Sequence, residues 1–362
     1  MLKIITRLKR LTFILISFST FFAFSQTAKY SNEFLNIGVD AASFGMANAV
    51  TATTSDVNSG YWNPAGLVHL EDNQVSAMHA NYFANIATYN YVAGAMPIDS
   101  KSAVGFSVIR FGVDDILNTT QLIDEQGNID YNRISLFSTA DYAFTLSYAR
   151  SLPLEGFSYG VNAKIIRRII GDFANAWGFG FDAGIQFQKN SWYFGIMARD
   201  ITTTYNTWTF DDSELATIQN AIEGQNQSTP EASEITLPKL QIGIARKTAI
   251  TRDFDLNTSL NLDMRFAQTN DVISSGTLSA TPAFGFEVGY INLVYLRGGV
   301  GNFQNIEQLG GNGTEIGFQP NFGVGFKYKG IQIDYALTDI GDQSLALYSN
   351  VFSLKLDWSV FR

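Results

Sequence analysis

Long stretches of this chain alternate strictly between apolar and polar residues. In the segment 254–266 every second residue is apolar, Thr258 excepted, and all of the residues between them are polar. A strand of a soluble protein also alternates, but rarely over 13 residues. One face is too apolar to meet water and the other is too polar for a sandwich core. This is the pattern of a transmembrane strand, whose side chains point alternately to lipid and to the lumen of a barrel.

The same alternation recurs in 142–149, 178–188, 322–328 and 352–360, the last of which ends near the C-terminus. Together with weaker segments it predicts fourteen strands, of which the first two alternate poorly. The predicted strands cover 74–83, 87–97, 102–112, 141–152, 157–168, 177–188, 191–201, 237–247, 253–266, 282–290, 293–302, 321–329, 330–340 and 349–361.

The connections between these strands differ in length in a regular way. Those after even-numbered strands are tight, whereas the long ones, 113–140, 202–236, 267–281 and 303–320, all follow odd-numbered strands. In an antiparallel meander, connections of one parity lie at one end. Short periplasmic turns and long extracellular loops are typical of outer-membrane barrels. We therefore predict an all-β fold, a 14-stranded antiparallel transmembrane β-barrel at 74–362, with both termini on the periplasmic side.

The first 25 residues predict export rather than structure. A basic start, from Lys3 to Arg10, precedes an apolar run of 14 residues, and small residues follow at Ala23 and Ser25. This pattern is typical of a signal peptide at 1–25, cleaved before Gln26. The alternative is a membrane anchor, but a spanning helix needs about 20 apolar residues.

Composition narrows the function classes. Removing the predicted signal, which carries four basic and no acidic residues, changes the formal charge from −9 to −13. Such a chain lacks the basic face of a nucleic-acid-binding protein. It has no cysteine, which excludes disulfides and thiolate sites, and 14% of its residues are aromatic. These properties favour a barrel in the outer membrane of a Gram-negative bacterium, with outer-membrane lipid as one partner.

Residues 26–73 are too long and too rich in turn residues for a strand, and we expect them to form a hatch inside the barrel. Irregular backbone is tolerated at membrane depth only when protein or water surrounds it. The most distinctive part is a turn with two aromatic residues beside it. The hatch motif comprises Asp56, Asn58, Ser59, Tyr61, Trp62, Asn63, Pro64, Ala65 and Gly66.

The run from Phe34 to Leu67, with Asp40, Ala41, Ala42, Gly45 and Met46 ahead of the turn, resembles the PorV/PorQ family of FadL-like barrels. The match is specific over about 35 residues. This resemblance implies an outer-membrane protein of the type IX secretion system, whose partners are other secretion subunits or secreted cargo domains. It also suggests a PorV paralogue.

Each residue of the turn has an expected role. Pro64 fixes a kink, Asn63 satisfies local backbone groups, and Gly66 permits a positive φ. Tyr61 and Trp62 are expected to wedge the hatch against the barrel wall. The alternative is a plug that only blocks leakage and binds nothing.

Other candidate sites are weak. His69 and His79 are too few for a metal site, and the segment 124–130 has only part of a calcium-loop pattern. Glycines at 178, 180, 298, 299 and 301 imitate a nucleotide fingerprint, but no helix follows them, and space in a filled lumen explains them better. We expect no metal, no cofactor and no enzyme activity, because a Ser/His/Asp set would need a histidine near the rim.

Lys164, Arg167 and Arg168 form a basic group at one end of a predicted strand. This group could meet lipopolysaccharide phosphates or an acidic partner. The alternative is an ordinary solvated strand end.

Two functions of different classes remain. A secretion component would bind its partner through the extracellular loops 113–140 and 202–236, and shortening 206–232 should then abolish partner binding. The alternative is a FadL-like channel for small hydrophobic molecules. The polar lumen faces noted above favour the first. The candidate partner-binding residues are Asp114, Asp115, Tyr205, Trp208, Phe210, Asp211 and Asp212.

Overall fold

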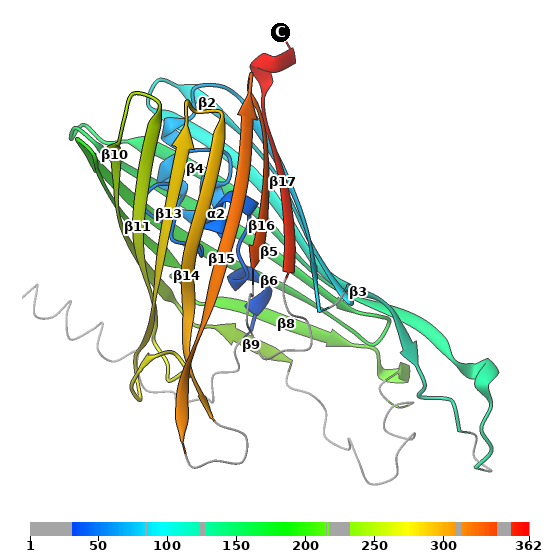
Figure 1. Cartoon of the computed structure of the whole chain (residues 1–362). Helices are drawn as coiled ribbons and strands as arrows, with labels where there is room; N and C mark the ends of the chain where they lie inside the picture. Colours follow the sequence, from blue (N-terminus) through cyan, green and yellow to red (C-terminus); the bar gives the residue numbers. More distant parts are fainter. Residues whose placement is uncertain are drawn as a thin grey trace, which may run out of the picture.

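The computed structural model describes residues 31–83, 85–123, 127–214, 216, 232–307, 313–338 and 349–361. Its strands form one antiparallel sheet that closes on itself, because β1 (Gln74–Tyr82) pairs with both β2 (Ala87–Asp99) and β17 (Ser349–Asp357) (Figure 1). Fourteen strands make up the closed ring. The predicted fold class is therefore confirmed.

The rest of the ring follows the order of the chain. It contains β3 (Ser102–Asn118), β4 (Ser135–Ser151), β5 (Phe157–Ile170), β6 (Ala174–Lys189), β7 (Trp192–Arg199), β10 (Lys239–Ala249), β11 (Phe254–Arg265), β13 (Ser279–Tyr290), β14 (Val294–Glu307), β15 (Thr314–Tyr328) and β16 (Ile331–Thr338).

Three shorter strands lie where long loops were predicted. β8 (Thr204–Phe210) and β9 (Ser233–Thr236) form a hairpin within 202–236, and β12 (Ile273–Ser274) lies within 267–281. The predicted loop 113–140 is also shorter, since β3 runs to Asn118 and β4 begins at Ser135. Strand pairing therefore continues well past the expected ends (Figure 1).

The predicted facing of side chains is confirmed. Leu260 is 49% exposed on the outer surface, whereas its neighbour Asn261 is 2% exposed and faces inward. Large apolar side chains such as Phe181, Phe322 and Phe352 are exposed on other strands. Lipid would cover this surface in an outer-membrane barrel. Among the described residues, no helix is long and apolar enough to cross a membrane.

The N-terminal segment lies inside the ring, where Figure 1 shows it in blue. It contains η1 (Glu33–Asn36), α2 (Ala41–Gly45), α3 (Ser59–Trp62) and η2 (Pro64–His69). Helix α2 contacts β14–β17, and η2 contacts β2–β6, so the segment reaches opposite walls. We call residues 40–70 the plug. Two further short helices, η3 (Tyr131–Arg133) and η4 (Trp358–Phe361), lie outside the plug.

The first described residue and the end of the C-terminal strand lie at opposite ends of the barrel. Ser31 bonds to Glu234 of β9, in the part of the wall beside the long connections. The C-terminus lies at the opposite end, where the short connections lie (Figure 1). The chain therefore enters the lumen beside β9 and crosses it before β1 begins. The predicted signal peptide lies outside the described residues, and the orientation of the termini across the membrane stays a prediction.

Candidate functional site

The centre of the plug is built by the predicted turn. Helix α3 ends at Trp62, and η2 starts at Pro64, whose missing N–H suits the first position of a helix. The Asn63 Oδ1 atom accepts a hydrogen bond from the Ala65 backbone N–H at 3.2 Å. Asn63 is thus the N-cap of η2, as its side-chain chemistry favours.

The polar residues before the turn hold one another. The Asp56 Oδ1 atom accepts from the Asn58 backbone N–H at 2.9 Å, and the Ser59 Oγ atom accepts from the Asp56 N–H at 3.0 Å. Asp56 also pairs with Lys355 of β17. Among the described atoms, neither the nitrogen nor the oxygen of the buried Asn58 side-chain amide has a hydrogen-bond partner.

Gly66 is required for space and not for its backbone angle. The expected positive φ is wrong, because Gly66 is not among the left-handed residues. A Cβ added there would lie 2.3 Å from the Thr54 carbonyl oxygen and 2.8 Å from Ser59 Oγ. The close approach of two plug turns therefore excludes any side chain.

Tyr61 and Trp62 fasten the segment that precedes the plug. The Tyr61 hydroxyl donates to the Leu35 carbonyl at 2.7 Å, and the Trp62 indole N–H donates to the Val39 carbonyl at 3.0 Å. Their rings meet edge to face with centroids 4.8 Å apart. They touch the wall through Arg199 of β7, whose guanidinium lies 4.4 Å from the Tyr61 ring centroid.

The plug rests directly on the wall backbone. The Asn63 side-chain amide donates to the carbonyls of Ile185 on β6, at 3.1 Å, and Ile196 on β7, at 3.4 Å. At Gly184 an added Cβ would lie 2.0 Å from Asn63 Oδ1. Similar contacts within 3.1 Å of plug atoms occur at wall glycines on seven strands: Gly160, Gly184, Gly195, Gly243, Gly285, Gly299 and Gly323. We call these seven residues the glycine seat. Of the glycines singled out in the sequence, Gly299 and Gly301 lie against the plug as expected, whereas Gly178 and Gly180 make room for side chains of β8 and Gly298 for the Phe286 ring.

Buried ion pairs surround the plug. Lys164 Nζ lies 2.7 Å from carboxylate oxygens of both Asp182 and Asp200. On the other side, Arg297 pairs with Glu287 at 2.6 Å and Asp334 at 2.7 Å. Lys164 and Arg297 are thus each matched by two carboxylates, as burial of their charge favours.

The predicted basic group does not exist as one surface. Lys164 and Arg168 face the lumen, where Arg168 pairs with Asp141 and Glu234. Arg167 lies on the other face and stacks over Trp177, 4.7 Å from the ring centroid. Strand alternation separates neighbours in sequence, so the three side chains cannot bind one partner together.

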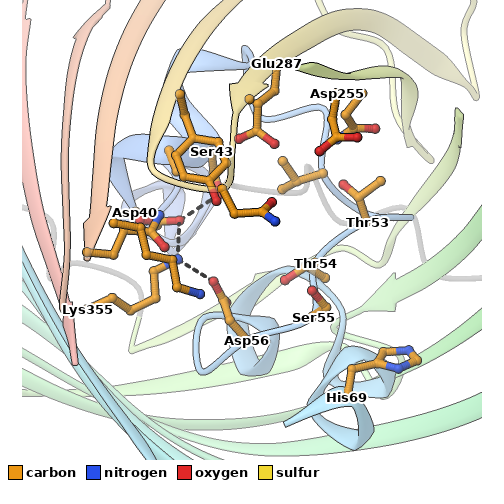
Figure 2. A pocket seen from close by; sticks show the side chains of 18 of the residues that line it. Asp40, Ser43, Thr53, Thr54, Ser55, Asp56, His69, Asp255, Glu287 and Lys355 are labelled. Carbon is orange, nitrogen blue, oxygen red and sulfur yellow. Dashed lines mark hydrogen bonds and ion pairs between the residues drawn. The ribbon is translucent and has the colours of Figure 1, made fainter. Parts of the chain in front are cut away.

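A polar cavity of about 780 Å³ lies between the plug and the end of the barrel with short connections. Its wall includes residues near the ends of β10, β11, β15 and β17, and plug residues from Asp40 to Asp56 line its inner side. Figure 2 shows Lys355 beside Asp40 and Asp56. Burial raises the pKa of the Asp40 carboxyl above its ordinary value, and the positive charge of Lys355 opposes this rise. We call this cavity the vestibule.

Apolar side chains fill the contact between the plug and one side of the wall. The inward faces of β1–β5 carry a buried cluster that includes Tyr89, Tyr91 and Ile109, and the same cluster contains Trp62 and Leu67 of the plug and Phe34 of the segment before it. The predicted polar lumen is therefore right for the vestibule and wrong here. The weak alternation of the first two strands was the available signal, because both of their faces are partly apolar.

Comparison with solved structures shows which barrels share this architecture. The monoaromatic hydrocarbon channel CymD superposes with a TM-score of 0.54 at 11% identity, over 91% of this chain and 99% of that one. The Pseudomonas putida toluene transporter TodX gives 0.54 at 11% identity, over 89% and 99%. A Pseudomonas aeruginosa FadL homologue gives 0.51 at 12% identity, over 88% and 98%.

The fold is that of the FadL-like outer-membrane barrels. At such low identity the likeness establishes the fold alone. No family model and no curated protein matches the chain. The resemblance to the PorV/PorQ family, read from the hatch motif, stays a prediction.

Most of the candidate partner-binding residues lie on strands and not on free loops. Asp114 and Asp115 lie at a bulge of β3, where Asp114 pairs with Arg110 at 3.0 Å. On β8, Tyr205 is 52% exposed on the outer face, whereas Trp208 is only 9% exposed. Trp208 packs against a small cluster with Phe210. Trp208 is therefore not a free interface anchor. Asp211 and Asp212 directly follow β8.

The two histidines lie apart. His79 bonds to Asn90 on the exposed side of β1, and His69 ends η2 beside the vestibule. Within the described part of the chain, no group of three potential metal-ligating side chains occurs. Most acidic residues of the segment 124–130 lie outside the described residues.

Residues that the sequence analysis did not single out complete the site. Arg199 and Gln241 lie at inward positions of β7 and β10, and Arg199 contacts both Gln241 and the plug; Asp200, directly after β7, pairs with Lys164. A charged residue at an inward strand position was the available signal, because such a charge needs a partner in the lumen.

Proposed function

We propose that this protein is an outer-membrane channel for a small hydrophobic molecule. The observation that carries this proposal is the apolar packing between the plug and the wall, where Tyr89, Tyr91 and Ile109 of the wall are buried. Movement of the plug would uncover these side chains, and an uncovered apolar surface favours contact with an apolar solute.

The proposed path has two parts. A solute entering from the end with long connections would have to displace the segment that contains Phe34 and Leu35 to reach the aromatic wall. The plug would then have to move, and the solute would leave through the vestibule. The change from apolar to polar lining would favour release, because an apolar molecule binds weakly to a polar wall. The similar barrels, which are described as hydrocarbon and toluene channels, support this proposal.

Uptake of labelled toluene by bacteria carrying the protein in their outer membrane tests the proposal. We expect faster uptake than in cells without the protein. Tyr91→Gln, which removes a buried ring from the apolar wall, should lower uptake at least about fivefold. The matched control Tyr91→Phe keeps the ring and should keep uptake. Uptake equal to that of cells lacking the protein would refute the channel.

A second candidate is a component of protein secretion, and one observation favours it. The β3–β4 and β8–β9 hairpins extend well beyond the closed ring, and they expose apolar side chains such as Leu117, Tyr131 and Tyr205 (Figure 1). Exposed aromatic and apolar side chains beyond the barrel are suited to a protein partner.

The deletion that tests this second candidate must respect the structure. Removing 206–232 would also remove Asn206, which bonds to Ser31 and Asn32 inside the barrel. Replacing 213–231 by a brief turn keeps both strands of the hairpin. Loss of a co-purifying partner from detergent extracts of this variant would support secretion, and an unchanged partner set would reject it.

A further inference from the structure

Arg199 differs from the other buried cations of the lumen. Lys164, Arg297 and Lys355 each contact two carboxylates. Among the described residues Arg199 has no carboxylate within ion-pairing distance. It donates instead to the Tyr61 backbone carbonyl at 2.8 Å and to Gln241 Oε1 at 2.7 Å. A permanent charge in a buried position thus depends on the plug for part of its hydrogen bonding.

Arg199 is also the last residue of β7, at a break in the wall. Its cross-strand partner Lys239 is the first residue of β10, so pairing between these two strands stops there. The chain then turns through Asp200 and Thr203, both with positive φ, of 53° and 60°. Beyond the break the chain continues as β8, which pairs with β6 and β9 and not with β10. The β8–β9 hairpin is therefore joined to the ring along one edge.

Non-glycine residues with positive φ cost free energy and persist only where their surroundings hold them. Here the surroundings are polar. The Asp200 carboxylate accepts from Lys164 and from the Thr204 hydroxyl, and its backbone N–H donates to Asp182 at 2.9 Å. Asn162 donates both to Asp182 and to the Gly60 carbonyl of the plug, the latter at 2.8 Å. Arg199 therefore contacts Tyr61 directly. Asp200 is linked to the adjacent plug residue Gly60 through Asp182 and Asn162.

The β8–β9 hairpin also contacts the N-terminal segment directly, at its first described residues. The Ser31 hydroxyl donates to Glu234 at 3.0 Å, and the Asn32 amide donates to Thr236 at 2.8 Å. Asn206 of β8 donates to the Ser31 hydroxyl at 2.6 Å. Tyr61 and Trp62 in turn hold Leu35 and Val39, as described above. The hairpin, the N-terminal segment and the plug therefore form one continuous set of contacts.

From these contacts we infer that Arg199 is the positioning residue through which the β8–β9 hairpin holds the plug shut, so that hairpin and plug open together. Swinging the hairpin away from β6 shifts the turn at Asp200 and with it the end of β7, so that Arg199 leaves Tyr61, and it draws the N-terminal segment from the lumen. This inference deepens the proposed function, and it rests on that function only for the identity of the solute.

A pair of engineered disulfides tests the inference in a chain with no cysteine of its own. Trp177 of β6 lies directly opposite Thr207 of β8. Antiparallel partners have Cα atoms about 4.5–5.5 Å apart, which a disulfide can bridge. Trp177→Cys with Thr207→Cys ties the hairpin to the ring. The matched control, Thr207→Cys with Ser233→Cys, ties β8 to β9 and leaves the hairpin free to swing.

The readout is the open probability of single barrels in planar bilayers, measured from ion conductance before and after reduction. We expect the oxidised hairpin–ring disulfide to lower the open probability at least about fivefold, and reduction to restore it. The control disulfide should change it less than about twofold. An oxidised hairpin–ring disulfide without effect would overturn the inference.

Arg199→Gln, added to the hairpin–ring disulfide, tests the role of the side chain itself. This variant should open more often, and oxidation should no longer change its open probability. If oxidation lowered opening as much as it does with Arg199 present, the coupling would not pass through this residue. Arg199→Lys keeps the charge and should restore part of the oxidation response, which a purely structural defect would not do.

Failure of this inference and failure of the proposed function give different results. Ion conductance reports plug opening whatever the natural solute is, whereas toluene uptake reports the solute. A barrel with redox-dependent conductance and no toluene uptake would keep the coupling and reject the hydrophobic channel. The opposite result would keep the channel and reject the coupling.

Discussion

Replacing Asn63 by alanine should loosen the plug. The side chain accepts a hydrogen bond from Ala65 and donates to the carbonyls of Thr51, Ile185 and Ile196. Two amide hydrogens can make only two of these donations well, and the contact with Ile196 at 3.4 Å is the longest. Alanine therefore removes about three good hydrogen bonds at a position with no solvent exposure.

Each such bond contributes about 1 kcal/mol to stability. One joins the plug to the wall, and the bonds to Thr51 and Ala65 lie within the plug. If the plug leaves its seat as a folded unit, only the wall bond counts, and the open population should rise less than about tenfold, since 1.4 kcal/mol corresponds to a factor of ten. If the turn unravels during opening, all three count, and the rise should be about a hundredfold.

Open probability in planar bilayers measures this change, and heat-modifiability on gels shows whether the barrel has assembled. Asn261→Ala is the matched control, because Asn261 is equally buried but donates to Asp263 of its own strand. It should leave opening unchanged. If assembled Asn63→Ala barrels open no more often than the control, Asn63 does not hold the plug.

Three further predictions follow from the wall and the plug. Leu260→Arg places a charge on the lipid face and should cost about 2–4 kcal/mol, whereas Asn261→Ala should cost far less; equal loss of heat-modifiability would contradict the facing. Tyr61→Ala combined with Trp62→Ala should raise antibiotic permeability, measured as lower inhibitory concentrations, because the two side chains fasten the segment before the plug. Gly285→Val should unseat the plug, since even a Cβ would lie 2.5 Å from the Met46 carbonyl oxygen; conductance as low as that of the unchanged protein would show that the wall gives way instead.

The sequence by itself determined the barrel. Lipid lies on one side of each strand and the lumen on the other, so successive side chains meet opposite surroundings, and this requirement is written into segments such as 254–266. The alternation of short and long connections followed from the same assignment of strands. The turn at Asn63 and Pro64 was equally accessible, because capping and the fixed φ of proline act within a few residues.

The sequence pattern did not predict how far strand pairing continues beyond the barrel. β8 and β9 lie inside 202–236, which has the turn and polar residues of a loop. These residues form strands because β7 ends at Arg199 and leaves residues 174–179 of β6 as an edge with which β8 pairs. Short strands with a partner far away in sequence depend on context more than on their own propensity.

Only the tertiary structure decided which residues share the site. Arg199 and Tyr61 are 138 positions apart, and Gly184 needs its small size only because Asn63 lies against it. The apolar lumen along β1–β5 likewise depends on the segment that packs there, and not on the strands alone. The two-residue period of a strand determines which face a side chain occupies. The neighbours of that face come from distant parts of the chain, because burial and close approach arise only when the barrel and its plug are packed together.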